Sequence, residues 1–149
     1  MLRAAILLLA MLLGGPVLAE TPAEAARRLY DRFVAAQNAR DINRVRFLLD
    51  EEPTFLWVSD GQSIWGREAM LRRMASFQEA PAWRVTPDLA TAQAVEVSPD
   101  AAFLHLKLEL AIGDARKPDR LPFLVSVLCR RTPGGWRIAA LFTTSEKQP

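Results

Sequence analysis

The stretch at residues 101–112 constrains the fold more than any other part of the chain. Leucines stand at every second position from 104 to 110, and the positions between them carry Phe103, His105, Lys107 and Glu109. Because successive side chains of a β-strand point to opposite sides, the alternation predicts a long strand with one buried face. His105 is expected on the face opposite the main core.

Further strands are predicted on both sides of this one. Residues from Trp83 onward read as strand, with 94–97 leading to a turn at Ser98-Pro99-Asp100. After a polar loop at 113–120, residues 121–129 are apolar at successive positions, as in a strand covered on both faces. Thr132-Pro133-Gly134-Gly135 predicts a turn into a last strand at 136–144.

The first half of the chain predicts helices. Thr21-Pro22-Ala23-Glu24 combines an N-cap, a proline at the first helical position and a glutamate that can close a capping box. Apolar residues then recur at helical spacing as far as Val34. Asp41 can cap a short second helix, and Gly66 precedes a third, predicted at 67–77.

Two short strands are predicted between the second and third helices, at 54–58 and 62–65, with a turn at Ser59-Asp60-Gly61. Helices near the start and antiparallel strands near the end predict an α+β fold, in which the helices cover one face of a bent sheet.

The first 19 residues have the layout of a secretory signal peptide. Arg3 precedes an apolar run at 4–13, a Gly-Gly-Pro break follows, and Val17 and Ala19 fit cleavage after Ala19. The run is short of the roughly 20 residues that span a membrane. We expect a periplasmic or secreted protein with no stable membrane anchor after cleavage, and one domain at 20–149.

Composition excludes several kinds of site. His105 is the only histidine and Cys129 the only cysteine, so metal sites that need two histidines and internal disulfides are excluded. The formal net charge of the whole chain is only +2, which does not favour a nucleic-acid partner. We expect neither a metal nor a cofactor.

Three stretches together resemble the nuclear-transport-factor-2-like (NTF2-like) superfamily, in particular its SnoaL-like branch. They are ARDINRVRFLLDEEPTFLWVSDGQSIWGREAM, VSPDAAFLHLKLEL and RRTPGGWRIAALFTTS, and the resemblance covers about residues 22–145. It implies a cone-shaped fold, in which a curved, mainly antiparallel sheet wraps around N-terminal helices and leaves an apolar cavity. It also implies homodimers that form through the sheet. Members include several classes of enzyme and non-catalytic domains, so the fold does not determine function.

The resemblance indicates where catalytic groups would stand. In its ketosteroid isomerase branch, a tyrosine of the first helix and a carboxylate near the end of the first strand act on the substrate. A gapless alignment places these roles at Phe33 and Trp57 and the partner acid near Ser126 or Val127. A histidine common in SnoaL-like relatives falls at or beside Phe142. These side chains cannot perform the acid–base work of an isomerase, so we expect a more apolar pocket.

The implied pocket has seven lining residues: Tyr30, Phe33, Trp57, Trp65, Ser126, Phe142 and Thr143. The preferred hypothesis is an exported module that binds a small hydrophobic ligand or serves for dimerisation. The alternative is a lyase, isomerase or cyclase acting on a small apolar substrate with Asp60 as base, since nearby aromatic side chains can raise the pKa of a carboxylate. His105 is a second candidate catalytic residue. Asp60 is interpreted first as a turn residue.

Overall fold

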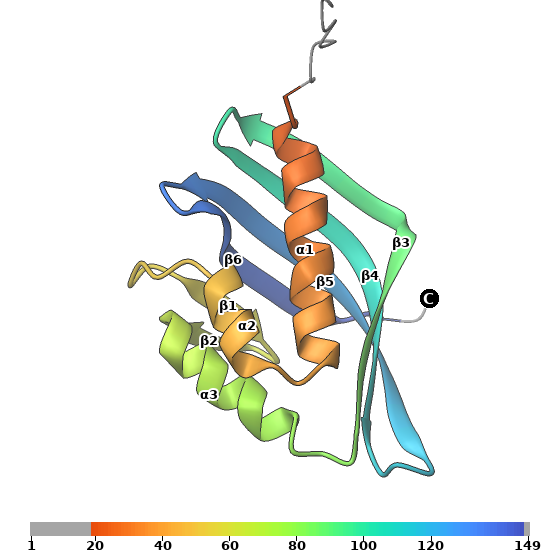
Figure 1. The fold of residues 1–149 in the computed structure, drawn as a ribbon. Coiled ribbons are helices and arrows are strands. Elements are labelled where there is room, and N and C mark those ends of the chain that lie inside the picture. The colour runs from red at the N-terminus through yellow and green to blue at the C-terminus, as the bar shows by residue number, and fades with distance from the viewer. Residues whose placement is uncertain (1–18, 148–149) are drawn as a thin grey trace, which may run out of the picture.

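Three helices lie on one side of a six-stranded sheet in the computed structural model, which describes residues 19–147 (Figure 1). Residues 1–18 of the predicted signal peptide lie outside the described residues, so export stays a prediction. No helix of the described part is long and apolar enough to cross a membrane.

The helices begin at the residues that the sequence predicts. At the start of α1 (Pro22–Asn38), the Thr21 hydroxyl accepts from the Glu24 N–H at 3.2 Å, and the Glu24 carboxylate accepts from the Thr21 N–H at 2.9 Å. Asp41 caps α2 (Ile42–Leu48). Before α3 (Arg67–Phe77), Gly66 has a φ of 82°, a conformation that favours glycine.

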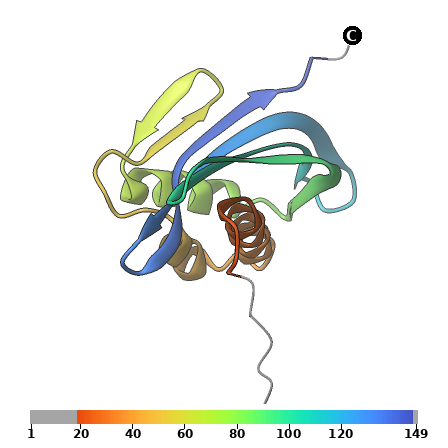
Figure 2. The same ribbon diagram turned by 90° about the horizontal axis from the view of Figure 1, so that it is seen from above.

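The strands are ordered β2-β1-β6-β5-β4-β3 across the sheet. Their bounds are β1 (Leu56–Ser59), β2 (Gln62–Trp65), β3 (Ala82–Ser98), β4 (Ala101–Gly113), β5 (Pro118–Thr132) and β6 (Gly135–Ser145). All neighbouring pairs are antiparallel except β1 and β6, which are parallel. The predicted α+β fold with a curved sheet is confirmed, and the strands arch over α1 (Figure 2).

One boundary differs clearly from the prediction. The edge strand β3 runs from Ala82 to Ser98, with a register shift between Asp88 and Gln93, in agreement with the strand pattern predicted from Trp83 onward. Strand β5, however, begins at Pro118, inside the predicted polar loop. This extension lies largely in solvent, where polar residues can pair through the backbone without an apolar pattern to mark them.

The alternation in β4 separates the two faces of the sheet. Leu104 and Leu106 are buried against the helices, while Phe103 and Lys107 are exposed on the outer face. In β5, Val125 and Val127 are buried, but Leu128 is exposed on the outer face. The inner face therefore forms the core, and the outer face keeps apolar side chains in contact with solvent.

Candidate ligand-binding cavity

A cavity of about 210 Å³ lies between the helices α1 and α3 and the inner face of the sheet. Its walls are mostly leucine, valine, methionine and aromatic side chains, contributed by both helices and by β1, β3, β4, β5 and β6. It is somewhat larger than an engineered apolar cavity of about 150 Å³ that holds benzene. The space therefore suits a small organic molecule.

Four of the seven expected pocket residues line this cavity: Tyr30, Phe33, Trp57 and Thr143. Tyr30 and Phe33 lie three residues apart on α1 and so share one face of the helix; their ring centroids are 6.0 Å apart. The rest of the expected set, Trp65, Ser126 and Phe142, lies outside the lining.

Strand geometry explains this correction. The two-residue turn pairs Trp57 with Ile64 and Leu56 with Trp65, which places the second tryptophan on the opposite face from the first. Trp65 is 60% exposed and Phe142 is 42% exposed. Because successive strand residues alternate, the inward direction of Val125 and Leu141 sends Ser126 and Phe142 outward.

His105 also lies on the outer face, as its alternation with the leucines predicts. Its Nδ1 is 2.9 Å from the Oγ of Ser126, its cross-strand neighbour in β5. Neither side chain lines the cavity, so the structure does not bring this candidate catalytic residue to the candidate site.

Asp60 lies where the cavity meets solvent. It is exposed, it contributes to the lining, and its φ of 50° and that of Gly61 at 71° form the two-residue turn between β1 and β2. Two consecutive positive φ values are typical of a type I′ hairpin turn. The sequence interpretation of Asp60 as a turn residue agrees with this conformation, and its position also keeps it within reach of a bound molecule.

Thr143 of β6 forms hydrogen bonds with β1 and so connects two walls of the cavity. Its hydroxyl accepts from Trp57 Nε1 at 3.3 Å and donates to the carbonyl of Val58 at 3.1 Å. The one hydroxyl proton is therefore already used. Thr143 orients Trp57 rather than offering a free donor to a ligand.

Three other polar side chains in the lining have no such partners. Tyr30, Gln37 and Ser59 are 1%, 6% and 6% exposed. No other group among residues 19–147 forms a hydrogen bond with these side chains, although the backbone oxygen of Gln37 accepts from Trp83 Nε1 at 3.0 Å. Burial raises the pKa of Tyr30 far above its usual value, with a smaller contribution from the charge of Asp31, so the phenol is neutral.

Gln37 and Ser59 are absent from the expected pocket, yet periodicity could have found them. Gln37 follows Phe33 by four residues on α1, and Ser59 follows Trp57 by two residues in β1. Each spacing returns to the same face of its element. The sequence predicts Ser59 as part of the turn, and the apolar pattern that marks the inner face of α1 does not include Gln37.

Arg73 packs against two aromatic side chains of the cavity wall, Trp57 and Phe77. Its guanidinium lies 5.8 Å from the ring centroid of Trp57 and 5.1 Å from that of Phe77, within the range of cation–π contacts. It also donates to Gln62 Oε1 at 3.0 Å. Arg73 does not line the cavity, so it provides packing and not a charge inside the site.

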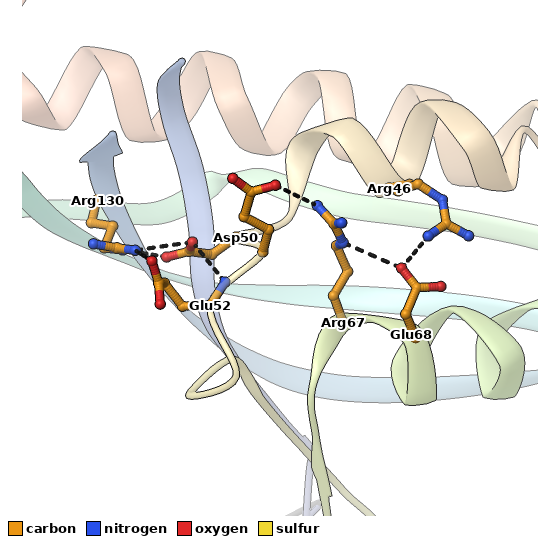
Figure 3. A network of polar contacts seen from close by, with 7 residues as sticks. Arg46, Asp50, Glu52, Arg67, Glu68 and Arg130 are labelled. Atoms are coloured by element: carbon orange, nitrogen blue, oxygen red, sulfur yellow. Dashed lines mark hydrogen bonds and ion pairs between the residues drawn. The ribbon is translucent and has the colours of Figure 1, made fainter. Parts of the chain in front are cut away.

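A second hollow, of about 370 Å³, lies beside the β5–β6 turn and is lined largely by charged residues. At its edge, the Asp50 carboxylate accepts from two nitrogens of Arg130, with Nη2 at 3.0 Å from Oδ1, and Arg130 is 3.8 Å from Glu52 (Figure 3). Burial alone would raise the pKa of Asp50, but hydrogen bonds from Arg130 and the Glu52 N–H, with the charge of Arg130, lower it overall.

The same network continues to the start of α3. Arg67 lies 3.5 Å from Glu68 and 3.9 Å from Glu51, and Glu68 also pairs with Arg46 of α2 (Figure 3). These contacts join α2, α3 and the segment between α2 and β1. The charges are thus matched within the protein, which indicates a structural role for this network.

Residues 19–147 contain no group of three or more His, Cys, Asp or Glu side chains that could hold a metal ion. Cys129 is buried, and burial raises the pKa of its thiol to about 12. A thiol with that pKa is a poor nucleophile near neutral pH.

Solved structures share this architecture. An uncharacterized protein with a cystatin-like fold from Caulobacter vibrioides superposes with a TM-score of 0.72 at 18% identity, covering 85% of this chain and 90% of that one. An NTF2-like superfamily protein from Salmonella enterica gives 0.71 at 13% identity, covering 81% and 88%. A ketosteroid isomerase-like protein from Erwinia carotovora gives 0.68 at 16% identity, covering 85% and 97%.

At these identities the similarity to solved structures establishes the fold alone. No curated protein matches the chain in sequence. The family model for the SnoaL-like domain, however, matches residues 26–141, from the second turn of α1 to the strand β6. The match covers more than half of the chain and includes all of the lining residues except Thr143. The chain therefore belongs to the SnoaL-like domain family.

Proposed function

We propose that the protein acts after export as a non-catalytic module that binds one small, largely apolar molecule in this cavity. The observation that carries the proposal is a largely apolar cavity whose ionisable lining residues, among residues 19–147, are Tyr30 and the solvent-facing Asp60, with no histidine or second carboxylate beside them. Mostly apolar pockets with a few polar groups are typical of sites for small organic ligands.

A variant that fills the cavity tests this proposal. Leu110 lines the cavity and is half-buried, so Leu110→Trp should occupy the space. Leu89 is 59% exposed on β3 and does not line the cavity, which makes Leu89→Trp a matched control. We expect the uncharged fluorescent probe N,N-dimethyl-1-naphthylamine to bind the mature protein and the control, with at least about tenfold weaker binding to Leu110→Trp. Equal binding to all three would contradict the proposal.

Dimerisation through the sheet is proposed from the outer face. Val95, Phe103 and Leu128 are cross-strand neighbours in β3, β4 and β5, and all three are exposed. In the strand pairing the row continues across the buried Ala140 and the half-buried Leu56 to the exposed Trp65. Exposed apolar side chains gathered in this way on one face often mark an interaction site.

Native mass spectrometry of the mature protein tests the dimer and reports any retained molecule. A charge in the middle of the row, Leu128→Glu, should convert dimers to monomers because the carboxylate would be desolvated at the interface. Leu89→Glu places the same charge outside the row and should leave the dimer intact. A wild-type monomer at micromolar concentration would refute this part of the proposal.

The second candidate function is a lyase, isomerase or cyclase with Asp60 as base. It is kept because Asp60 contributes to the cavity lining. Asp60→Asn preserves the shape of the turn residue and removes its basicity, and asparagine also tolerates a positive φ. Turnover of an apolar substrate that this substitution abolishes would favour the enzyme, whereas unchanged ligand binding without turnover would favour the binding module.

A further inference from the structure

The cavity contains three polar side chains whose hydrogen-bonding capacity is not met by the rest of residues 19–147. They are Tyr30, Gln37 and Ser59, each more than nine-tenths buried. Native proteins pair nearly all buried polar groups, since an unpaired group loses its contacts with water and gains nothing in return. Three exceptions around one space indicate that a molecule in that space supplies the partners.

These polar atoms face the cavity and not closed protein interior. In the described part, the side-chain polar atoms that are fully enclosed and have no hydrogen-bond partner are the Nε atoms of Arg67 and Arg73. The side chains of Tyr30, Gln37 and Ser59 therefore keep accessible surface, and the cavity is the space that they line. Thr143 differs from them because its hydroxyl is held between Trp57 and Val58.

The charge of the lining restricts the ligand further. Among residues 19–147, no lysine, arginine or histidine lines the cavity, and the guanidinium of Arg73 packs against the rings of Trp57 and Phe77. A carboxylate or phosphate placed among these apolar walls would lose its hydration without a cation to replace it. The nearest charge in the lining, that of Asp60 at the solvent side, would repel it.

We infer that the cavity selects an uncharged, mainly apolar molecule that carries a hydroxyl or carbonyl group, bound by the Tyr30 hydroxyl with Gln37 and Ser59 as the neighbouring polar contacts. The neutral phenol of Tyr30 donates to an acceptor on the ligand. The Gln37 amide and the Ser59 hydroxyl can each donate or accept. This inference rests on the proposed binding function and adds the chemistry by which the ligand is chosen.

Three bicyclic probes of nearly equal size separate the possibilities: naphthalene, naphthol and naphthoate. Each is measured by displacement of N,N-dimethyl-1-naphthylamine from the mature protein. We expect naphthol to bind about threefold to tenfold more tightly than naphthalene, the effect of one net hydrogen bond. Naphthoate should bind more weakly than naphthalene because its charge is unpaired.

Substitutions test which side chains cause the preference for naphthol over naphthalene. Tyr30→Phe removes only the hydroxyl and should bring naphthol and naphthalene to equal affinity, while naphthalene binds as in the wild type. Ser59→Ala and Gln37→Leu should each reduce the preference for naphthol by a smaller factor. Ser126→Ala, on the outer face, is the matched control and should leave the preference unchanged. A thermal unfolding curve for each variant confirms that it is folded.

The outcomes distinguish this inference from the proposed function. Equal binding of naphthol and naphthalene to the wild type, or a preference that none of the three cavity variants reduces, would overturn the inference and leave the binding module standing. Tightest binding of naphthoate would overturn it as well. If N,N-dimethyl-1-naphthylamine binds in the cavity and neither naphthol nor naphthalene displaces it, the inference fails. If N,N-dimethyl-1-naphthylamine itself does not bind, the proposed function fails as well.

Discussion

The two hollows of this protein differ in whether their buried polar side chains have hydrogen-bond partners. Beside the β5–β6 turn, Asp50 is buried but meets Arg130 through two hydrogen bonds, and the surrounding charges pair with one another. In the cavity under the sheet, Tyr30 is equally buried and meets no partner in the described part of the chain. The first arrangement pairs its polar groups within the protein, whereas the second leaves a phenol hydroxyl without a hydrogen-bond partner among residues 19–147. A buried polar group thus indicates function only after its partners have been counted.

Removal of the ion pair between Asp50 and Arg130 should have the largest effect on stability. Arg130→Met keeps much of the side-chain shape but leaves the Asp50 carboxylate buried without its cation. We expect the free energy of unfolding to fall by about 3 kcal/mol, the lower end for a broken buried pair because Arg130 is itself partly exposed. Urea denaturation measures the change. Arg84→Met, at an exposed arginine without an ion pair among residues 19–147, is the control and should stay within about 0.5 kcal/mol of wild type.

Acidification should reduce the difference in unfolding free energy between the wild type and Arg130→Met. The pKa of Asp50 lies below the ordinary value of 3.8 in the folded state, so its pair with Arg130 stabilises fully above about pH 5 and is lost as pH falls through the folded-state pKa. In Arg130→Met, burial instead raises the pKa of Asp50, and protonation relieves the unpaired charge. We expect the difference in unfolding free energy to shrink by roughly half between neutral pH and pH about 3. A constant difference across this range would show that the charge of Asp50 is not responsible.

Within the cavity, the paired hydroxyl should matter more for stability than the unpaired one. Thr143→Val removes the acceptor of Trp57 Nε1 and the donor to Val58 while keeping the shape of the side chain. We expect a loss of about 1 kcal/mol in unfolding free energy, typical of a hydrogen bond in a partly buried site. A blue or red shift in tryptophan fluorescence should accompany it, because the environment of Trp57 changes.

The smallest effect on stability is expected for Tyr30→Phe. The hydroxyl has no partner in the described part of the chain to lose, so unfolding free energy should change by less than about 0.5 kcal/mol without ligand. The same substitution should remove the preference for naphthol, which separates a binding role from a structural one. A loss as large as that of Thr143→Val would indicate that the Tyr30 hydroxyl is paired after all.

Local signals in the sequence predicted much of the fold. The caps at Thr21 and Asp41, the turn at Asp60-Gly61 and the alternation around His105 depend on residues close together in the chain. Such short-range chemistry operates before any tertiary contact forms, so it can be recognised without the structure.

The candidate site was predicted less completely because its lining depends on which way each strand faces. β5 is apolar on both sides, so periodicity could not say that Val125 points inward and Ser126 outward, and a bulge after Leu128 shifts its register with β6. Gln37 and Ser59 were missed for a different reason: buried polar residues contradict the apolar pattern from which an inner face is recognised. Such contradictions are expected at functional sites.

The position of β6 has a consequence for the order of folding. The β1–β2 hairpin, which carries Trp57, Ser59 and Asp60, joins the sheet only through the parallel pairing of β1 with β6 (Figure 1). Leu56 pairs with Ala140, so these contacts span more than half of the chain and close a long loop. Until the last strand is available, one wall of the cavity has no sheet edge to join. Because the contact between β1 and β6 is long-range, we expect this wall of the cavity to form late in folding.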